Sequence, residues 1–116
     1  AMRHKIVVLG QDVLSMVQAT VKAYTQRDQD AARFIWAQDC QIDRSATRVR
    51  DAILEQLEGT AAQKLLAQDG HEVQLLTFLL GITYRLERIA DHCTNICERI
   101  VFLIEGNVDM APLLNE

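Results

Sequence analysis

The sequence predicts an all-α protein, an up-down-up bundle of three helices around one core. Strand-forming residues do not cluster along the 116 residues, aromatic side chains make up only 5%, and the single proline is Pro112. Roughly a hundred residues therefore run without the residue that most often interrupts helices. Apolar residues account for 49% of the chain, which is enough for one hydrophobic core but not for two ordinary ones.

The first predicted helix covers about Lys5 to Tyr24. A polar break at residues 25–28 follows it, and Asp28 is a suitable N-cap because its side chain can accept hydrogen bonds from the free amides of the next turn. Within the helix, apolar or small residues recur at helical spacing: Val13, Val17, Thr20 or Val21, and Tyr24.

The second predicted helix begins at Asp28 and ends near Gly59, a natural C-terminal residue for a helix. Its apolar residues follow a near-heptad rhythm, which makes one narrow stripe facing a neighbouring helix. The stripe consists of Ile35, Ile42, Ala46, Val49, Ile53 and Leu57. A separate short helix is expected from Thr60 to about Ala67.

The last and longest predicted helix runs from His71 to Glu105, after a turn at residues 69–70 and before a stop at Gly106. We expect one domain over residues 1–107 and a tail over residues 108–116. The predicted core stripe of this helix is Leu86, Ile89, Ile96, Ile100 and Ile104, with Cys93 and Cys97 as small buried residues beside it. A second face opposite this stripe mixes apolar and acidic residues and is expected to contact a partner or to be covered by the short helix: Val73, Thr77, Leu80, Tyr84, Glu87, Asp91 and Phe102.

Charge and cysteine content exclude several classes of protein. A net charge of -4 disfavours nucleic acid as a partner, since its binders need a basic patch, and we interpret Arg44, Arg48 and Arg50 as a solvated face. Three cysteines cannot all pair, so a reducing, cytoplasmic location is expected. Cys40 points away from its stripe and is the best candidate for a reactive thiol. The longest apolar run, residues 75–82, is too short to span a bilayer, so no membrane insertion is expected.

Two pairs of acidic residues are chemically unusual. Asp39 and Asp43 lie four residues apart on the second helix, and Glu87 and Asp91 have the same spacing on the last. Like charges at this spacing repel unless a cation or an arginine lies between them. Hard cations bind carboxylate oxygens, and two acids one turn apart supply two ligands from one rigid element.

The phase of the helices does not by itself bring the two pairs together. Asp39 lies near the core stripe of its helix, whereas Glu87 and Asp91 lie opposite the stripe of theirs. If the pairs do not meet, each could bind its own ion with water or a partner's ligands. Shielding by Arg33 or Arg44 remains the alternative interpretation.

The most specific pattern lies in the last helix, where residues 85–99 read RLERIADHCTNICER. This run resembles the signature of the PhoU family, whose members carry leucine, glutamate, arginine, isoleucine, a small residue, aspartate and histidine in this order. Upstream, residues 27–32 (RDQDAA) and 39–43 (DCQID) are similar to the family's second-helix segment. The resemblance covers roughly residues 13–105.

The resemblance implies a helical bundle whose E(D)xxxD motifs hold multinuclear iron or zinc sites in some members. The carboxylate ligands themselves also suit Mg²⁺ or Mn²⁺. Here those motifs are Asp39, Asp43, Glu87 and Asp91. It also implies a non-enzymatic regulator that represses phosphate-starvation signalling by contact with the phosphate ABC transporter and a phosphate-responsive sensor histidine kinase. Typical members carry two such three-helix repeats and this chain one, which implies a homodimer or a second repeat. Cys93 and Cys97 replace small apolar residues of many members.

Two other classes of protein fit the sequence less well. A ferritin-like di-iron enzyme requires Glu-x-x-His motifs, and none of the three histidines follows a glutamate at that spacing. A histidine phosphotransfer or kinase-dimerisation module could use His71 with its acidic neighbour Glu72, and a test for acid-labile phosphate would identify it. The sequence has no Gly-rich phosphate loop, so direct phosphate binding is not expected.

Overall fold

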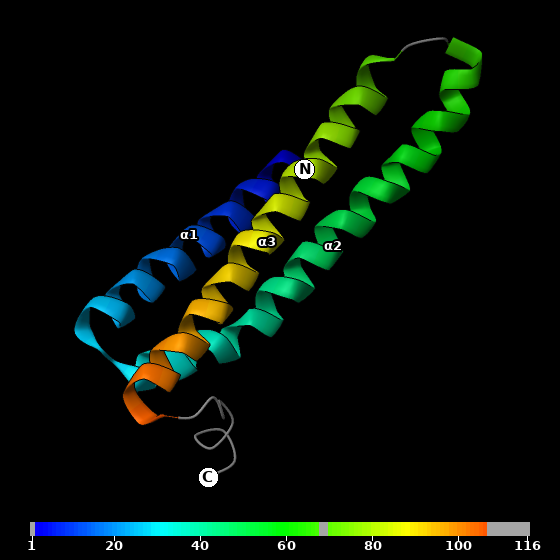
Figure 1. Cartoon of the computed structure of the whole chain (residues 1–116). Helices are drawn as coiled ribbons and strands as arrows, with labels where there is room; N and C mark the ends of the chain where they lie inside the picture. The colour runs from blue at the N-terminus through cyan, green and yellow to red at the C-terminus, as the bar shows by residue number, and fades with distance from the viewer. Residues whose placement is uncertain (1, 68–69, 107–116) are drawn as a thin grey trace.

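The computed structural model describes residues 2–67 and 70–106, with the backbone alone for residues 60–67. Three helices follow one another: α1 (Met2–Gln26), α2 (Gln29–Ala67) and α3 (His71–Glu105). Figure 1 shows α1 and α3 running in the same direction, with α2 antiparallel to both. The predicted all-α, up-down-up three-helix bundle is confirmed. The predicted tail, residues 108–116, lies outside the described residues.

The turn between α1 and α2 is closed by the predicted cap. The amide of Ala31 donates to the Asp28 carboxylate at 3.0 Å, which satisfies one of the free amides of the first turn of α2. Arg27 reverses the chain with φ 52°. At the other end of the bundle, Gly106 ends α3 in the left-handed region (φ 79°) and its amide donates to the carbonyl of Phe102, as the sequence predicted.

The predicted break at Gly59 is wrong, because α2 continues through it to Ala67. Glycine inside a helix costs only about 1 kcal/mol relative to alanine. The flanking residues are strong helix formers, with leucine and glutamate on one side and alanine, glutamine and lysine on the other, so the local cost is outweighed. The segment 60–67 is therefore the last part of α2 and not a separate helix that folds over α3.

The core runs along the line where the three helices meet. The predicted stripe of α2 is confirmed: Ile35, Ile42, Ala46, Val49 and Ile53 are buried, and Leu57 packs against them. Cys93 and Cys97 are buried as predicted. Thr20 is also buried, and its hydroxyl donates to the carbonyl of Met16 at 2.7 Å, so this polar group enters the core with its hydrogen bond satisfied.

The predicted core stripe of α3 is only partly right. Ile100 is buried and Leu86 packs against the core, but Ile89, Ile96 and Ile104 are 41%, 43% and 40% exposed. The buried residues of α3 are instead mostly small: Leu76, Thr83, Ala90, Cys93, Cys97, Ile100 and Val101. A helix with two neighbours buries the side where both can approach closely, and small side chains permit that approach better than isoleucine.

In α1 the predicted positions Val13 and Thr20 are buried, whereas Val21 and Tyr24 are 57% and 61% exposed. By length and composition alone α1 could cross a membrane, and about a third of its apolar window is buried in the bundle. Core helices of globular bundles meet the same criterion, and α1 contributes five buried residues to this core.

Candidate metal centre

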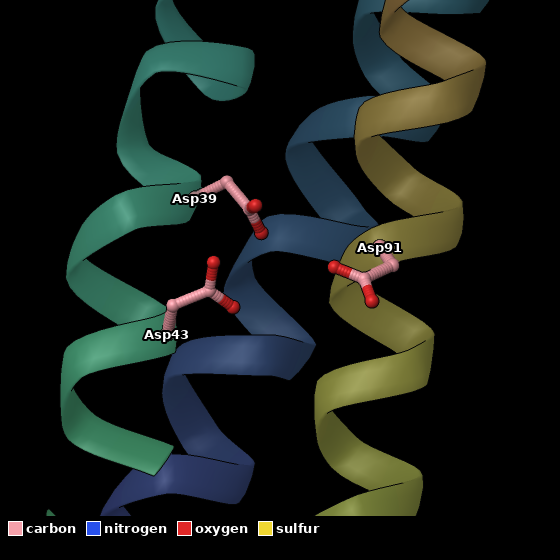
Figure 2. A group of neighbouring side chains, drawn as sticks. All are labelled: Asp39, Asp43 and Asp91. Atoms are coloured by element: carbon pink, nitrogen blue, oxygen red, sulfur yellow. The ribbon is translucent and has the colours of Figure 1, made fainter. Parts of the chain in front are cut away.

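Three of the four predicted acidic residues come together across the seam between α2 and α3. One carboxylate oxygen each from Asp39, Asp43 and Asp91 lies within 4.8 Å of the others. Figure 2 shows the side chains of Asp39 and Asp43 extending from α2 toward Asp91 on α3. Oxygen ligands about 2.0–2.6 Å from a single cation can be no more than about 5 Å apart. The group therefore has the spacing of a three-carboxylate ion site.

The helices fix this arrangement in two ways. Asp39 and Asp43 are one turn apart, so they lie on the same side of α2. Asp91 follows directly after Ala90, which is completely buried, and one residue of helix turns the side chain by about 100° from the core toward the neighbouring helix. The neighbouring helix on that side is α2. The sequence had placed Asp91 opposite the core because it predicted a different buried side for α3; with the observed buried side, Asp91 and the acids of α2 can meet.

Asp39 is the least exposed member of the cluster. Its Oδ1 is buried and has no hydrogen-bond partner among the described residues. Burial, reinforced by the negative charges of Asp43 and Asp91, raises the pKa of Asp39 to about 6. Asp43 and Asp91 are exposed to solvent. An unpartnered buried oxygen between two carboxylates is a position where a proton or a cation lowers the free energy.

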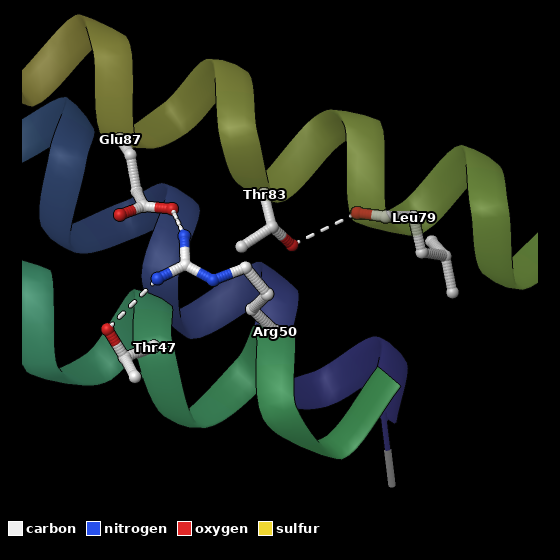
Figure 3. A network of polar contacts seen from close by, with 5 residues as sticks. All are labelled: Thr47, Arg50, Leu79, Thr83 and Glu87. Carbon is white, nitrogen blue, oxygen red and sulfur yellow. Dashed lines mark hydrogen bonds and ion pairs between the residues drawn. The ribbon is translucent and has the colours of Figure 1, made fainter. Parts of the chain in front are cut away.

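The fourth predicted residue, Glu87, lies outside this group. Its carboxylate accepts a hydrogen bond from Arg50 of α2 in an ion pair, and Arg50 also donates to the Thr47 hydroxyl at 3.2 Å. Figure 3 shows Arg50 reaching from α2 between Thr47 and Glu87, with Thr83 bonded to the carbonyl of Leu79 nearby. Glu87 is thus neutralised by an arginine and not by the metal ion that the sequence predicted.

Arg50 was therefore misassigned to a solvated face. The side chain is 35% exposed and Glu87 is 16% exposed, so the pair is partly withdrawn from water. The signal in the sequence was the position of Arg50 directly after the buried Val49, at the edge of the α2 stripe. Arg33, which was expected as a possible shield of the acidic pairs, is only 4% exposed and pairs with Glu105 of α3.

A surface cavity of about 350 Å³ lies beside Asp91, one member of the cluster. Both Glu87 and Asp91 border this cavity, so the two acids of the α3 motif share one space although only Asp91 joins the carboxylate group. The cavity is lined by Arg50, Tyr84, Glu87, Arg88, Asp91, His92 and Asn95.

The other candidate residues, His71 and the three cysteines, lie outside the carboxylate group. His71 is exposed at the first position of α3. Cys40 is exposed as predicted, whereas burial raises the pKa of the Cys97 thiol to about 11 and also raises that of Cys93. The two buried cysteines therefore act as small core residues.

The fold and the site together define an all-α bundle protein with a carboxylate cluster on facing helices. Helical bundles commonly build their ion sites from side chains on facing helices. Comparison with protein families narrows this class. The family model described as the PhoU domain matches residues 6–100. The chain belongs to the PhoU family.

Relatives in this family cover most of the chain. A phosphate-specific transport system accessory protein PhoU homolog from Clostridium acetobutylicum is 31% identical over 98 residues, which are 84% of this chain and 41% of that protein. A PhoU homolog 1 from Thermotoga maritima is 31% identical over 80% of this chain and 36% of its own length. The Escherichia coli accessory protein PhoU is 26% identical over 84% and 37%.

The chain thus spans about two fifths of the length of the relatives it matches. No solved structure was found that matches it.

Proposed function

We propose that this chain is a regulatory adaptor of phosphate uptake that acts by contact with other proteins and not by catalysis. Its partners in this proposal are the phosphate ABC transporter and a phosphate-responsive sensor histidine kinase. The observation that carries the proposal is membership of the PhoU family over residues 6–100, together with relatives named as accessory proteins of phosphate-specific transport. The work of such an adaptor takes place in the cytoplasm.

The shape of the molecule is consistent with this role. The acidic cluster and its adjoining cavity lie on one long seam, and large apolar side chains are exposed on two sides of α3, including Tyr84 at 56% and Ile96 at 43%. Exposed apolar groups of this size usually mark contact surfaces.

Binding assays test the adaptor function directly. The purified chain is immobilised and exposed to the cytoplasmic part of the sensor kinase and, separately, to the ATP-hydrolysing subunit of the transporter, both from the same genome. Saturable binding to at least one is expected. Absence of binding to both, with and without divalent cation, would rule out the adaptor proposal.

We also propose that Asp39, Asp43 and Asp91 hold a divalent or transition metal ion. Iron or zinc is favoured by the family resemblance, while the all-carboxylate donor set also suits Mg²⁺ and Mn²⁺. Glu87 can become a ligand only if it releases Arg50. The support is the mutual spacing of the three oxygens and the unpartnered Oδ1 of Asp39.

Calorimetric titration of the metal-free chain with Mn²⁺, Fe²⁺, Zn²⁺ and Mg²⁺ tests the site. An Asp43→Asn, Asp91→Asn double variant should lose binding, whereas Glu87→Gln should keep it if the three aspartates are sufficient. The matched control is Asp51→Asn, which removes an exposed carboxylate from α2 outside the cluster. Equal metal binding by the wild type and the double variant would refute the site.

We further propose that a second three-helix unit accompanies this one, either in a homodimer or as a further repeat in the same polypeptide. The support is the length of the relatives, of which this chain matches about two fifths. The exposed side chains Tyr84 and Phe102 on the predicted second face of α3 are the proposed contacts. Light scattering over a range of concentrations should show a dimer of the 116-residue chain if self-association supplies the second unit.

A further inference from the structure

One side of the bundle carries an apolar face that none of the sites above uses. On α1 the exposed residues Val7, Leu14 and Val21 recur every seven positions, and on α3 Ile89, Ile96 and Leu103 do the same. We call these six residues the α1–α3 apolar face. Their exposed fractions lie between 41% and 72%, and residues seven apart stay within about 20° of one another around a helix. Each helix therefore presents a straight apolar stripe.

Both stripes lie on the sides of α1 and α3 that face away from α2. On the opposite side of α1, Asp12, Ser15 and Ala19 line a cavity shared with α2, so the Val7–Leu14–Val21 side of α1 is turned away from α2. At the end of the bundle, Tyr24 and Thr25 of α1 line a cavity of about 330 Å³ together with Leu103 and Ile104 of α3. Figure 1 shows α1 lying along α3. The two stripes thus flank the seam between α1 and α3.

A heptad spacing on two parallel helices is the pattern that receives a third helix. Successive residues of each stripe lie about 10.5 Å apart along the axis, which is the repeat of a helix that inserts its side chains between them. A peptide that binds by strand addition would require a sheet edge, and the described residues contain only helices.

The charges beside this face determine which helix fits. Arg85, Arg88 and Arg99 are exposed along the outer side of α3, next to the Ile89–Ile96 stripe, and within the described residues none of them forms an ion pair. We call these three residues the basic ridge. It stands out because the chain as a whole carries a net charge of -4.

A second copy of this chain does not supply the complementary charges through the same face. The only acidic residue of α1 is Asp12, and it borders the groove to α2. On α3, Glu87 and Asp91 are turned toward α2 through Arg50 and the aspartate cluster, and Glu105 pairs with Arg33 of α2. Glu98, two residues after Ile96, lies about 160° around the helix from it, and Glu72 lies about 25 Å along the axis from Ile89. A pairing of two such faces would therefore leave both basic ridges without acids and, where the ridges meet, would oppose like charges.

We propose that the α1–α3 apolar face and the basic ridge form a docking site for an amphipathic helix of a partner protein, with apolar residues at heptad spacing and acidic residues along the flank beside α3. This inference deepens the proposed adaptor function and rests on it. It assigns the apolar contact to the side of α3 that lies beside α1, whereas the aspartate cluster lies on the side beside α2. Of the basic ridge, Arg88 also lines the cavity that Asp91 borders.

A displayed peptide library tests the inference. All members carry three heptads with leucine and isoleucine at the core positions, and the flanking positions are randomised among Glu, Gln and Lys. Selection on the wild-type chain should enrich Glu along one flank, and an enriched peptide should bind at least tenfold more weakly to Leu14→Glu and to Ile96→Glu. Leu54→Glu is the matched control, because Leu54 lies on α2 with 42% exposure and its substitution should leave binding unchanged.

Charge reversal gives the second arm. The triple variant Arg85→Glu, Arg88→Glu, Arg99→Glu should select Lys in place of Glu on the same flank, and circular dichroism establishes that each variant is folded. The inference is overturned by flanks that stay random, by a concentration-dependent dimer that Leu14→Glu abolishes, or by binding to anionic phosphatidylserine vesicles without peptide enrichment. If the library fails while the sensor kinase or the transporter subunit still binds, the adaptor function stands and only the docking site falls.

Discussion

Replacing Asp39 by asparagine should stabilise the metal-free protein at neutral pH. The carboxylate of Asp39 is partly buried beside two other carboxylates, and its Oδ1 has no hydrogen-bond partner among the described residues. Asparagine has nearly the same shape, carries no charge and can donate a hydrogen bond to Asp43. The substitution therefore removes the repulsion without opening a cavity.

The magnitude and its pH dependence follow from the pKa of Asp39. The change from the ordinary value of 3.8 to about 6 corresponds to at most about 3 kcal/mol, and partial exposure with solvent screening reduces this to about 1–2 kcal/mol. Because the folded-state pKa is the higher one, the folded protein binds the proton more tightly than the unfolded chain. The stabilisation by this proton is complete below pH ~4 and is lost as the pH rises through about 6.

Thermal and urea denaturation followed by circular dichroism measure the effect. At pH 7.5 with chelator, Asp39→Asn should raise the melting temperature by about 5–10 °C, and near pH 4.5 its advantage should fall to less than half. Asp51→Asn should change little at either pH. Saturating Mn²⁺ should stabilise the wild type and not the variant. An Asp39→Asn protein that is less stable than the wild type at pH 7.5 would refute the account of the cluster.

Three further outcomes are expected. Gly59→Ala should raise the free energy of unfolding by about 0.5–1 kcal/mol, because the added Cβ meets no atom within 4 Å; destabilisation would contradict the continuous α2. Arg50→Met should lower the free energy of unfolding by about 1–3 kcal/mol by leaving Glu87 without its partner, and Glu87→Gln in the same chain should recover part of the loss, as a double-mutant cycle in urea would show. A maleimide should modify Cys40 alone under native conditions, because it is exposed and burial raises the pKa of Cys97 to about 11; mass spectrometry should find one label on the wild type and none on a Cys40→Ser control, and labelling of the control would contradict the prediction.

The helices themselves could be predicted from the sequence because their signals are local. A chain without internal proline, the cap at Asp28 and the terminal glycine at Gly106 act within one turn of their own position. The largest error in the helix boundaries concerned Gly59, where a local preference of about 1 kcal/mol competes with the propensity and packing of a whole helix. Such competition cannot be resolved from a window of a few residues. Helix α1 also extends beyond the predicted residues 5–24, to Met2–Gln26.

The candidate site was predicted less completely, because it depends on how α3 is rotated about its axis. Periodicity identified an apolar stripe through Ile89 and Ile96, but α3 carries apolar residues on two sides, and hydrophobicity alone does not say which side is buried. The prediction therefore placed Asp91 opposite the core. The pairing of Arg50 with Glu87 could not be predicted either, since it depends on the register between α2 and α3.

The small residues of α3 account for both candidate surfaces. Ala90 and Cys97 are completely buried, with Cys93 close behind, and small side chains at these positions let α1 and α2 approach α3 closely. This choice of core side turns Asp91 toward Asp39 and Asp43. It also leaves Ile89 and Ile96 exposed beside α1, although isoleucine would gain about 1.5–3 kcal/mol from full burial. Apolar groups left exposed at that cost along a straight heptad are best explained by a partner helix that buries them.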